Sequence, residues 1–176
     1  MNEVVLKPQD ILALFKLLIT GGRSYPYSEM AKEINLSSSE LHSAVKRLEK
    51  NGLFSVDTNS VVISSLKEFI LYGAKYVFPA ELGMLTRGIP TSFSAEPLKS
   101  LLSQSDTEVF VWAHAEGTHR GTAFTPLYKT APDAALKDEK LYRLLSLFDA
   151  LRSGRARERA IAKEMMEKEV GLYAKG

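Results

Sequence analysis

The sequence predicts an α+β protein in which a helix-rich N-terminal third precedes a mixed C-terminal region. Three observations carry this prediction. Apolar residues recur at helical spacing in three consecutive segments before residue 52. Two short β-prone runs follow, separated by four turn-forming residues. Beyond residue 78, an apolar strand candidate and two long helical patterns indicate a small β element with two or three helices.

The first three helices have recognisable ends. Pro8 suits the first position of a helix, because its missing N–H would be unpaired there, and Gly21-Gly22 ends that pattern. A short second helix is expected from Ser28 to Ile34. Hydroxyl groups at positions 37–39 can cap a third helix, which Asn51-Gly52 would close with a left-handed turn.

The segment after the third helix reads as a hairpin. Leu53 to Val56 and Val61 to Ser64 are the β-prone runs, and residues 57–60 form the turn between them. Helix, helix, turn, helix, hairpin is the order of elements in a winged helix-turn-helix. We therefore expect that fold over residues 1–66, followed by a linking helix over residues 67–78 that Pro79 ends.

The region 79–176 is expected to dimerise or to bind a partner. Its first part, 79–106, is loop-rich and is expected to clamp the two halves together or to hold an effector. Short helical turns are expected at Glu81–Thr86 and Pro97–Ser103, strands at Glu108–Ala113 and Ala123–Tyr128, and helices at Ala131–Leu151 and Arg155–Tyr173 with a break at Gly154. The wide apolar face of the first long helix should pack on the strand pair or on a second subunit, which predicts a homodimer.

Composition narrows the class of protein. No apolar run is long enough for a membrane span, no signal peptide is recognised at the start, and there is no cysteine for a disulfide framework or a thiolate metal site. We therefore expect a cytoplasmic protein. The net charge of +2 is small, and residues 1–66 carry seven basic and seven acidic side chains, so the N-terminal third is neutral.

The third helix nevertheless has an apolar face for the core and an opposite polar face, as a DNA-recognition helix requires. In a helix-turn-helix, the residues near the start of this helix contact base edges in the major groove. Ser28, at the start of the second helix, can offer a backbone N–H to a phosphate, and the hairpin turn can reach the backbone or the minor groove. The expected contacts to double-stranded DNA are Ser38, Ser39, His42, Ser43, Lys46 and Arg47 from the third helix, Ser28 from the second, and Thr58, Asn59 and Ser60 from the wing.

The segment "YSEMAKEINLSSSELHSAVKRLEKNGLF" resembles the winged helices of MarR-like regulators, over about sixty residues of the chain. Positions that match the family's usual residues are Ala31, Leu36, Leu41, Val45, Leu48 and Gly52. The wing lacks the arginine that such proteins often place at its tip, and the recognition face has only two basic residues. The resemblance implies a winged-helix fold and contact with DNA. We therefore expect a sequence-specific DNA-binding regulator of transcription, a repressor.

A second basic segment, "LRSGRARERAIAK", allows another interpretation. On a continuous helix Arg152, Arg155 and Arg159 share one side, with Arg157 and Lys163 close by. These side chains would contact phosphates or an acidic partner, or would form a solvated face paired with glutamates at four-residue spacing. The alternative function is therefore a protein-interaction module, such as an antitoxin-like or adaptor subunit.

No enzyme is expected. His114 and His119 lie near Glu116, but they lack a third ligand of recognisable geometry, so a loop with two histidines is favoured over a metal site. No catalytic constellation, phosphate-binding loop or nucleophile elbow is present, and no cofactor is expected.

Overall fold

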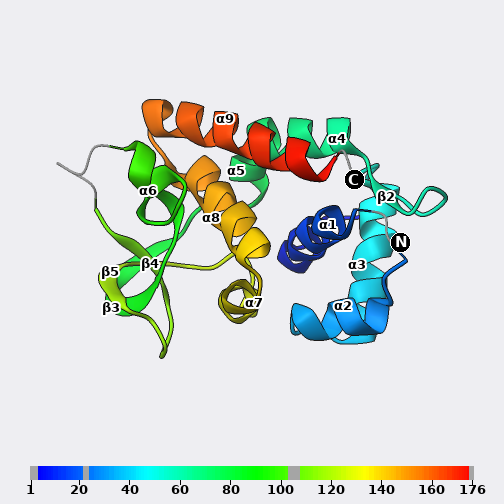
Figure 1. Cartoon of the computed structure of the whole chain (residues 1–176), viewed down its shortest axis with the longest axis horizontal. Coiled ribbons are helices and arrows are strands. Elements are labelled where there is room, and N and C mark those ends of the chain that lie inside the picture. Colours follow the sequence, from blue (N-terminus) through cyan, green and yellow to red (C-terminus); the bar gives the residue numbers. More distant parts are fainter. Residues whose placement is uncertain (1–3, 22–23, 103–107, 175–176) are drawn as a thin grey trace.

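The computed structural model describes residues 4–21, 24–102 and 108–174 and has a mixed α+β fold. Helices form most of it, and a three-stranded sheet lies at one end of its long axis (Figure 1). No helix in these ranges is long and apolar enough to cross a membrane. The α+β class expected from the sequence is confirmed.

Three helices and a short hairpin open the chain in the expected order. They are α1 (Pro8–Thr20), α2 (Tyr27–Glu33), α3 (Ser38–Lys50), β1 (Phe54–Ser55) and β2 (Ser60–Val61), with β1 and β2 antiparallel. The α2–α3 turn passes through Asn35, whose φ of 53° lies in the left-handed region that asparagine tolerates. Ser37 then caps α3, because its Oγ accepts the Glu40 N–H at 3.1 Å while the Glu40 carboxylate accepts the Ser37 N–H at 2.8 Å.

The linking helix begins earlier than expected. The second run of the hairpin was predicted to continue to Ser64, which is wrong, because α4 (Ile63–Glu68) begins two residues after β2. A π-helical turn, η1 (Phe69–Gly73), and α5 (Ala74–Val77) continue it as far as the residue before Phe78. Leu66 and Ile70 are buried in the core, so the early start of the helix places an apolar face inside.

The C-terminal sheet consists of β3 (Leu82–Pro90), β4 (Phe110–Ala113) and β5 (His119–Phe124). Strand β3 pairs antiparallel with both others, and β4 and β5 are parallel, so the three strands close on themselves. The helical turn predicted at 81–86 is therefore wrong. Its apolar residues are exposed rather than on a buried helix face, with Met84 86% exposed, and long-range pairing with β5 sets the backbone conformation.

The position of β5 was also predicted wrongly, at 123–128 instead of 119–124. Gly121 precedes the predicted strand, but it belongs to β5, where it pairs with Thr86 of β3. A Cβ at this position would lie 2.3 Å from the Val109 carbonyl oxygen. Glycine is therefore needed for the close approach of two strands, and it does not mark a loop.

The remaining helices fall in the expected segments, except for the 3-10 turn η2 (Ser92–Ser94), which was not predicted. The others are α6 (Leu98–Leu101), α7 (Ala131–Lys137), α8 (Glu139–Ser153) and α9 (Ala156–Tyr173). The continuous helix predicted at 131–151 is interrupted at Asp138, whose extended backbone (φ −142°, ψ 101°) and side chain form the N-cap of α8. Gly154, also extended, separates α8 from α9 as expected.

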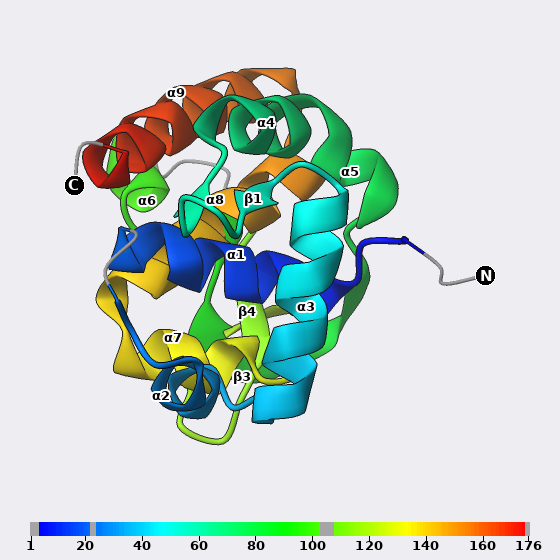
Figure 2. The same ribbon diagram turned by 90° about the vertical axis from the view of Figure 1, so that its right-hand side faces the viewer.

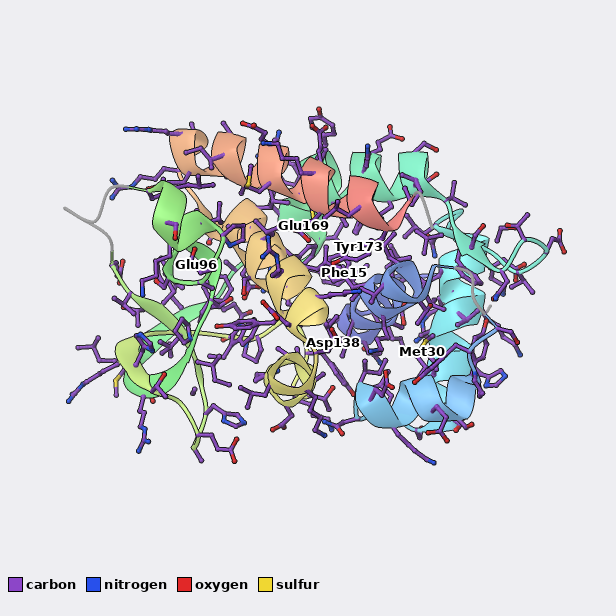
Figure 3. All side chains as sticks on the ribbon, viewed as in Figure 1. Phe15, Met30, Glu96, Asp138, Glu169 and Tyr173 are labelled. Carbon is purple, nitrogen blue, oxygen red and sulfur yellow. The ribbon has the colours of Figure 1, made fainter. Side chains whose placement is uncertain are left out.

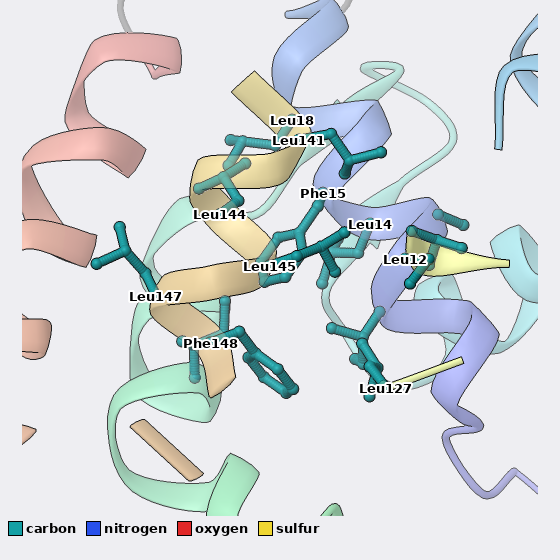
Figure 4. Close-up of a cluster of buried hydrophobic side chains, with 14 of the residues drawn as sticks. Leu12, Leu14, Phe15, Leu18, Leu127, Leu141, Leu144, Leu145, Leu147 and Phe148 are labelled. Atoms are coloured by element: carbon teal, nitrogen blue, oxygen red, sulfur yellow. The ribbon is translucent and has the colours of Figure 1, made fainter. Parts of the chain in front are cut away.

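Helix α8 lies between the N-terminal helices, the sheet and α9 (Figures 1 and 2). Its apolar residue Leu145 lies beside α1, and the rings of Phe148 and Phe15 meet edge to face at 5.6 Å (Figure 4). The apolar core is thus continuous from residues 1–66 into residues 79–176. Because this face is covered within the chain, it gives no support to the homodimer that was predicted from it.

A buried carboxylate fixes the sheet to α8. Asp149 is 1% exposed and accepts hydrogen bonds from Thr91 Oγ1 at 2.7 Å and from Trp112 Nε1 at 2.8 Å. It also forms an ion pair at 2.7 Å with Arg152, whose guanidinium donates to the Phe78 carbonyl at 3.0 Å. One acidic side chain therefore joins α8 to β4, to the end of β3 and, through Arg152, to the end of α5.

Replacing this carboxylate should destabilise the whole chain. Asp149→Ala leaves the Arg152 cation buried without its partner, and we expect the free energy of unfolding to fall by about 3–5 kcal/mol. Chemical denaturation followed by circular dichroism measures the change. Asp133→Ala, at an exposed aspartate that pairs with His114, is the matched control and should cost no more than about 0.5 kcal/mol. Equal losses in the two variants would contradict the role given to Asp149.

Candidate nucleic-acid interface

Helix α3 separates a buried face from an exposed polar face, as predicted. Leu41, Ala44, Val45 and Leu48 are buried against the other N-terminal helices. In Figure 2, α3 lies on the side of the molecule that faces the viewer. The predicted contact residues that are exposed on it are Ser38, Ser39, His42, Ser43 and Lys46. Apart from His42, none of their side chains makes a hydrogen bond or ion pair within the described part of the chain.

His42 is held in one orientation. Its Nδ1 lies 3.1 Å from the Ser38 carbonyl oxygen, which can only accept, so Nδ1 carries the hydrogen when the ring is neutral. The ring also packs edge to face against Tyr27 of α2 at 5.3 Å. This tautomer makes Nε2 an acceptor, which suits the exocyclic amino groups of adenine and cytosine in the major groove.

Arg47 does not belong to this exposed face, and its predicted place there is corrected. Its Nε and Nη2 donate to the two carboxylate oxygens of Asp10 at 2.8 and 2.7 Å, and the side chain is 16% exposed. Asp10 is fully buried and also accepts the Lys7 N–H at the start of α1. Position 47 borders the buried stripe, between Ala44 and Leu48, so its long side chain turns inward and joins α3 to α1.

The predicted contacts outside α3 are weaker candidates. Ser28 is exposed in the first turn of α2, although that helix begins one residue earlier, at Tyr27. In the turn between β1 and β2, which was predicted to be a wing, the hydroxyl groups of Thr58 and Ser60 lie 2.7 Å apart and bond to each other, and Asn59 has a φ of 48° and is half-buried. The exposed carboxylate of Asp57 beside them would repel a phosphate, so this turn adds no positive charge to the candidate interface.

Two lysines that sequence reasoning missed lie beside the α2–α3 turn. Thr130 Oγ1 donates to the Ile34 carbonyl at 2.9 Å, which attaches the start of α7 to the end of α2. Lys137 Nζ then lies 3.5 Å from Asn35 Oδ1. Lys129 acts on Glu40 at the start of α3, whose pKa is lowered mainly by the Ser37 hydrogen bonds and further by this cation. Figures 1 and 2 both show α7 next to α2.

These lysines change the charge of the surface around α3. Lys46, Lys129 and Lys137 are exposed and make no ion pair among the described residues. The nearby carboxylates of Glu29 and Glu40 are engaged, by Lys32 at 3.1 Å and by the Ser37 cap respectively. No pattern in the sequence signals this arrangement, because Lys137 and Asn35 are 102 residues apart along the chain.

The arginines of the second basic segment do not share a face, so that prediction is wrong. The break at Gly154 places Arg152 on α8, where its side chain is 4% exposed and bound to Asp149. Arg155 and Arg157 are exposed at the start of α9, at the opposite end of the long axis from α3 (Figure 1). Arg159, one turn further along, is half-buried. These side chains therefore do not extend the polar face of α3.

The two histidines of the sheet are engaged by protein groups. His114 Nδ1 accepts the Glu116 N–H at 3.1 Å, and its Nε2 lies 3.0 Å from Asp133 Oδ1. His119 Nδ1 lies 2.9 Å from the hydroxyl of Thr118. In the described ranges, no three His, Cys, Asp or Glu side chains form a group that could hold a metal ion.

A network of charges holds α2 against the rest of the molecule. Lys16 of α1 is 8% exposed and lies 2.6 Å both from Glu33 Oε2 of α2 and from Asp138 Oδ2, which is labelled in Figure 3. The Tyr25 hydroxyl also donates to Glu33. Burial opposes the charge of Lys16, but the hydrogen bonds of the two carboxylates outweigh it and raise its pKa. The hydrogen bond from Lys16 lowers the pKa of Glu33. Burial raises the pKa of Asp138, but the hydrogen bonds from Lys16 and from two backbone N–H groups outweigh burial, so this pKa is lowered as well.

Comparison with known proteins adds no relative: no protein-family model matches the chain, and neither a curated protein nor a solved structure matches it. The interpretation of the interface therefore stands on the geometry described above.

Lys16→Met should destabilise the chain in a pH-dependent way. The folded-state pKa values of Glu33 and Asp138 lie below their unfolded values of about 4, so their stabilisation is present above that pH and is lost as the pH falls through the folded values. We expect the free energy of unfolding to fall by about 1–2 kcal/mol at neutral pH and by less at pH 3. The expected loss is modest because Glu33 is half-exposed, and solvent screens its ion pair with Lys16. Denaturant titrations at both pH values measure it. Lys32→Met, which breaks an exposed pair, is the control, and a loss that does not shrink at pH 3 would refute this assignment.

Arg47 and Lys46 are neighbours in α3 but should contribute very differently to the stability of the folded chain. Arg47→Ala leaves the buried Asp10 carboxylate without its partner and should lower the free energy of unfolding by about 3 kcal/mol. Lys46→Ala, one residue earlier and exposed, should change it by less than about 0.5 kcal/mol. Thermal denaturation of both variants is the measurement. An Arg47 variant as stable as the Lys46 variant would mean that Arg47 is available to the exposed face after all.

Proposed function

We propose that the chain is a sequence-specific DNA-binding regulator of transcription, a repressor, in which residues 1–66 act as a winged helix-turn-helix. The observation that carries this proposal is the division of α3 into a buried apolar face and an exposed face of small hydroxyl groups, one oriented imidazole and one lysine. Such a face has the donors and acceptors that base edges require, and it is narrow enough to enter a major groove.

In this proposal the first two turns of α3 read the bases. Ser38 and Ser39 are at its N-terminal end, and Ser43 and His42 follow one turn later on the exposed side. Lys46 lies one turn further along and is placed for a phosphate or for a guanine. Arg47 is excluded from the contacts because Asp10 holds it.

The C-terminal region supplies the phosphate contacts that a neutral N-terminal third lacks. Lys129 and Lys137 lie beside the α2–α3 turn, so a duplex against α3 would have these cations near its backbone. Each phosphate that a lysine neutralises releases counterions, which makes binding depend on salt. The wing, with Asp57 and without an arginine, has a minor part in this arrangement.

Regulators of this kind bind two half-sites with two copies of the chain, because a two-fold protein matches a palindromic operator. We accordingly keep the homodimer as part of the proposal, with an interface outside the buried face of α8. A cytoplasmic location belongs to the same proposal, since the target would be the genome.

Fluorescence anisotropy of labelled DNA tests the function. The probes are a duplex from upstream of the chain's own coding sequence and a duplex of mixed sequence, titrated over a range of salt. We expect selective binding that weakens steeply with salt. Lys46→Ala should weaken binding to both duplexes by roughly 3- to 10-fold and make the salt slope shallower by about one, whereas His42→Ala should reduce selectivity by about 1 kcal/mol.

Lys99→Ala removes an equal charge from the exposed surface of α6, far from α3 in Figure 1, and should leave binding unchanged. Absence of binding to either duplex at low salt would overturn the proposed function. Binding that Lys46→Ala and Lys99→Ala weaken equally would show that α3 is not the contact surface.

A further inference from the structure

A second surface lies between the linking helix and α9. It is a groove of about 290 Å³ whose walls come from η1 and α5 on one side and from the first turns of α9 on the other. Leu71 and Leu151 form part of an aliphatic floor. The groove shares no residue with the polar face of α3, and the proposed function does not use it.

The charge of this groove has one sign. Lys75 of α5 and Arg159 and Lys163 of α9 line it, and no carboxylate does. None of the three cations forms an ion pair with a carboxylate in the described part of the chain, although α9 pairs Lys168 with Glu164 elsewhere along its length. Three cations around one groove repel one another, and a bound anion would remove that repulsion.

The groove also exposes two aromatic rings. Tyr72 is 64% exposed and Tyr76 is 75% exposed, although tyrosine carries a large apolar surface. The ammonium groups of Lys163 and Lys75 lie over these rings, 4.4 and 4.8 Å from the ring centres. Tyrosine and arginine are the residue types that contribute most at protein–protein contacts, because their rigid or planar groups lose little entropy on binding.

The backbone at Tyr72 is unusual as well. Tyr72 belongs to the π-helical turn η1, which interrupts an otherwise α-helical segment, and such turns are frequent at functional sites. The turn begins at the half-buried Phe69, whose ring packs edge to face on the buried Phe78, whereas Tyr72 is exposed to solvent. The irregular turn therefore presents an aromatic ring at the mouth of the groove.

We propose that this groove binds an acidic segment of a partner protein. Carboxylates of the segment would pair with Lys75, Arg159 and Lys163, and its apolar side chains would lie on Tyr72, Tyr76 and the aliphatic floor. A peptide fits better than a nucleic-acid strand, because the aliphatic floor suits apolar side chains and offers no surface for stacked bases. The alternative interpretation of the sequence placed a partner protein on the arginines of residues 152–159. The proposed groove is a different site, because it includes Arg159 but not Arg152.

Selection from a random twelve-residue peptide library tests this on the full chain, with the Lys75→Ala/Lys163→Ala variant as the counter-target. We expect peptides rich in Asp and Glu, interspersed with Leu or aromatic residues, to be enriched on the wild-type chain only. A labelled copy of an enriched peptide is then titrated by anisotropy. Its affinity should fall at least about tenfold in Lys75→Ala/Lys163→Ala and in Tyr72→Ala/Tyr76→Ala, and should be unchanged in Lys99→Ala/Lys168→Ala.

Circular dichroism and the thermal midpoint check that each variant is folded; Tyr72 and Tyr76 are exposed, and Lys75 and Lys163 are half-buried without an ion pair among the described residues. Enrichment without an acidic bias, or equal enrichment on the variant, would overturn the proposal. So would binding of a thymidine oligonucleotide that the Lys75/Lys163 variant loses, or a dimer of the chain that dissociates in that variant, because the groove would then hold a nucleic acid or a second copy.

Discussion

The arrangement of this molecule depends on the burial of α8 between the N-terminal helices and the C-terminal sheet. Phe148 meets Phe15 on one side, and Asp149 accepts hydrogen bonds from Thr91 and Trp112 on the other, so one helix fixes the positions of both neighbours. At the N-terminal end of the same helix, Asp138 caps the backbone and binds Lys16 of α1. Moving the N-terminal helices away from α8 would break the Lys16–Asp138 ion pair, and moving the sheet away would remove two hydrogen-bond donors from the buried Asp149 carboxylate; both changes are costly.

This constraint has a direct consequence for the candidate interface. The position of α7 follows from that of α8, because Asp138 alone separates the two helices; Lys137 is the last residue of α7, and Lys129 lies two residues before its start. Lys129 and Lys137 therefore reach the α2–α3 turn as parts of a packed unit and not as side chains of a loose extension. The polar face of α3 and the groove between α5 and α9 share no side chain, so the two proposed ligands, DNA and an acidic segment, would bind on separate surfaces.

The sequence predicted most of the helices because their ends carry local signals: Pro8, the serines before α3 and Gly154 each act within one turn. The sheet was harder to predict, since residues 82–86 and Gly121 take their conformation from strands far away in the chain. The exposed residues of α3 followed from helical periodicity. Periodicity did not predict the surroundings of four charged side chains, because these depend on residues far away in the fold or on burial of the whole segment. The carboxylates of Asp10 and Asp149 pair with Arg47 and Arg152. Asn35 lies beside Lys137, and Glu40 lies near Lys129.

Hydrogen–deuterium exchange of the full chain, with and without an excess of a mixed-sequence duplex at low salt, tests the central claim most directly. If α3 and the start of α7 form one DNA interface, the duplex should slow exchange in residues 37–47 and 128–137 together and leave residues 71–76 and 156–163 unchanged. Slower exchange confined to the segments around the α9 groove, or no change in any segment, would contradict the account.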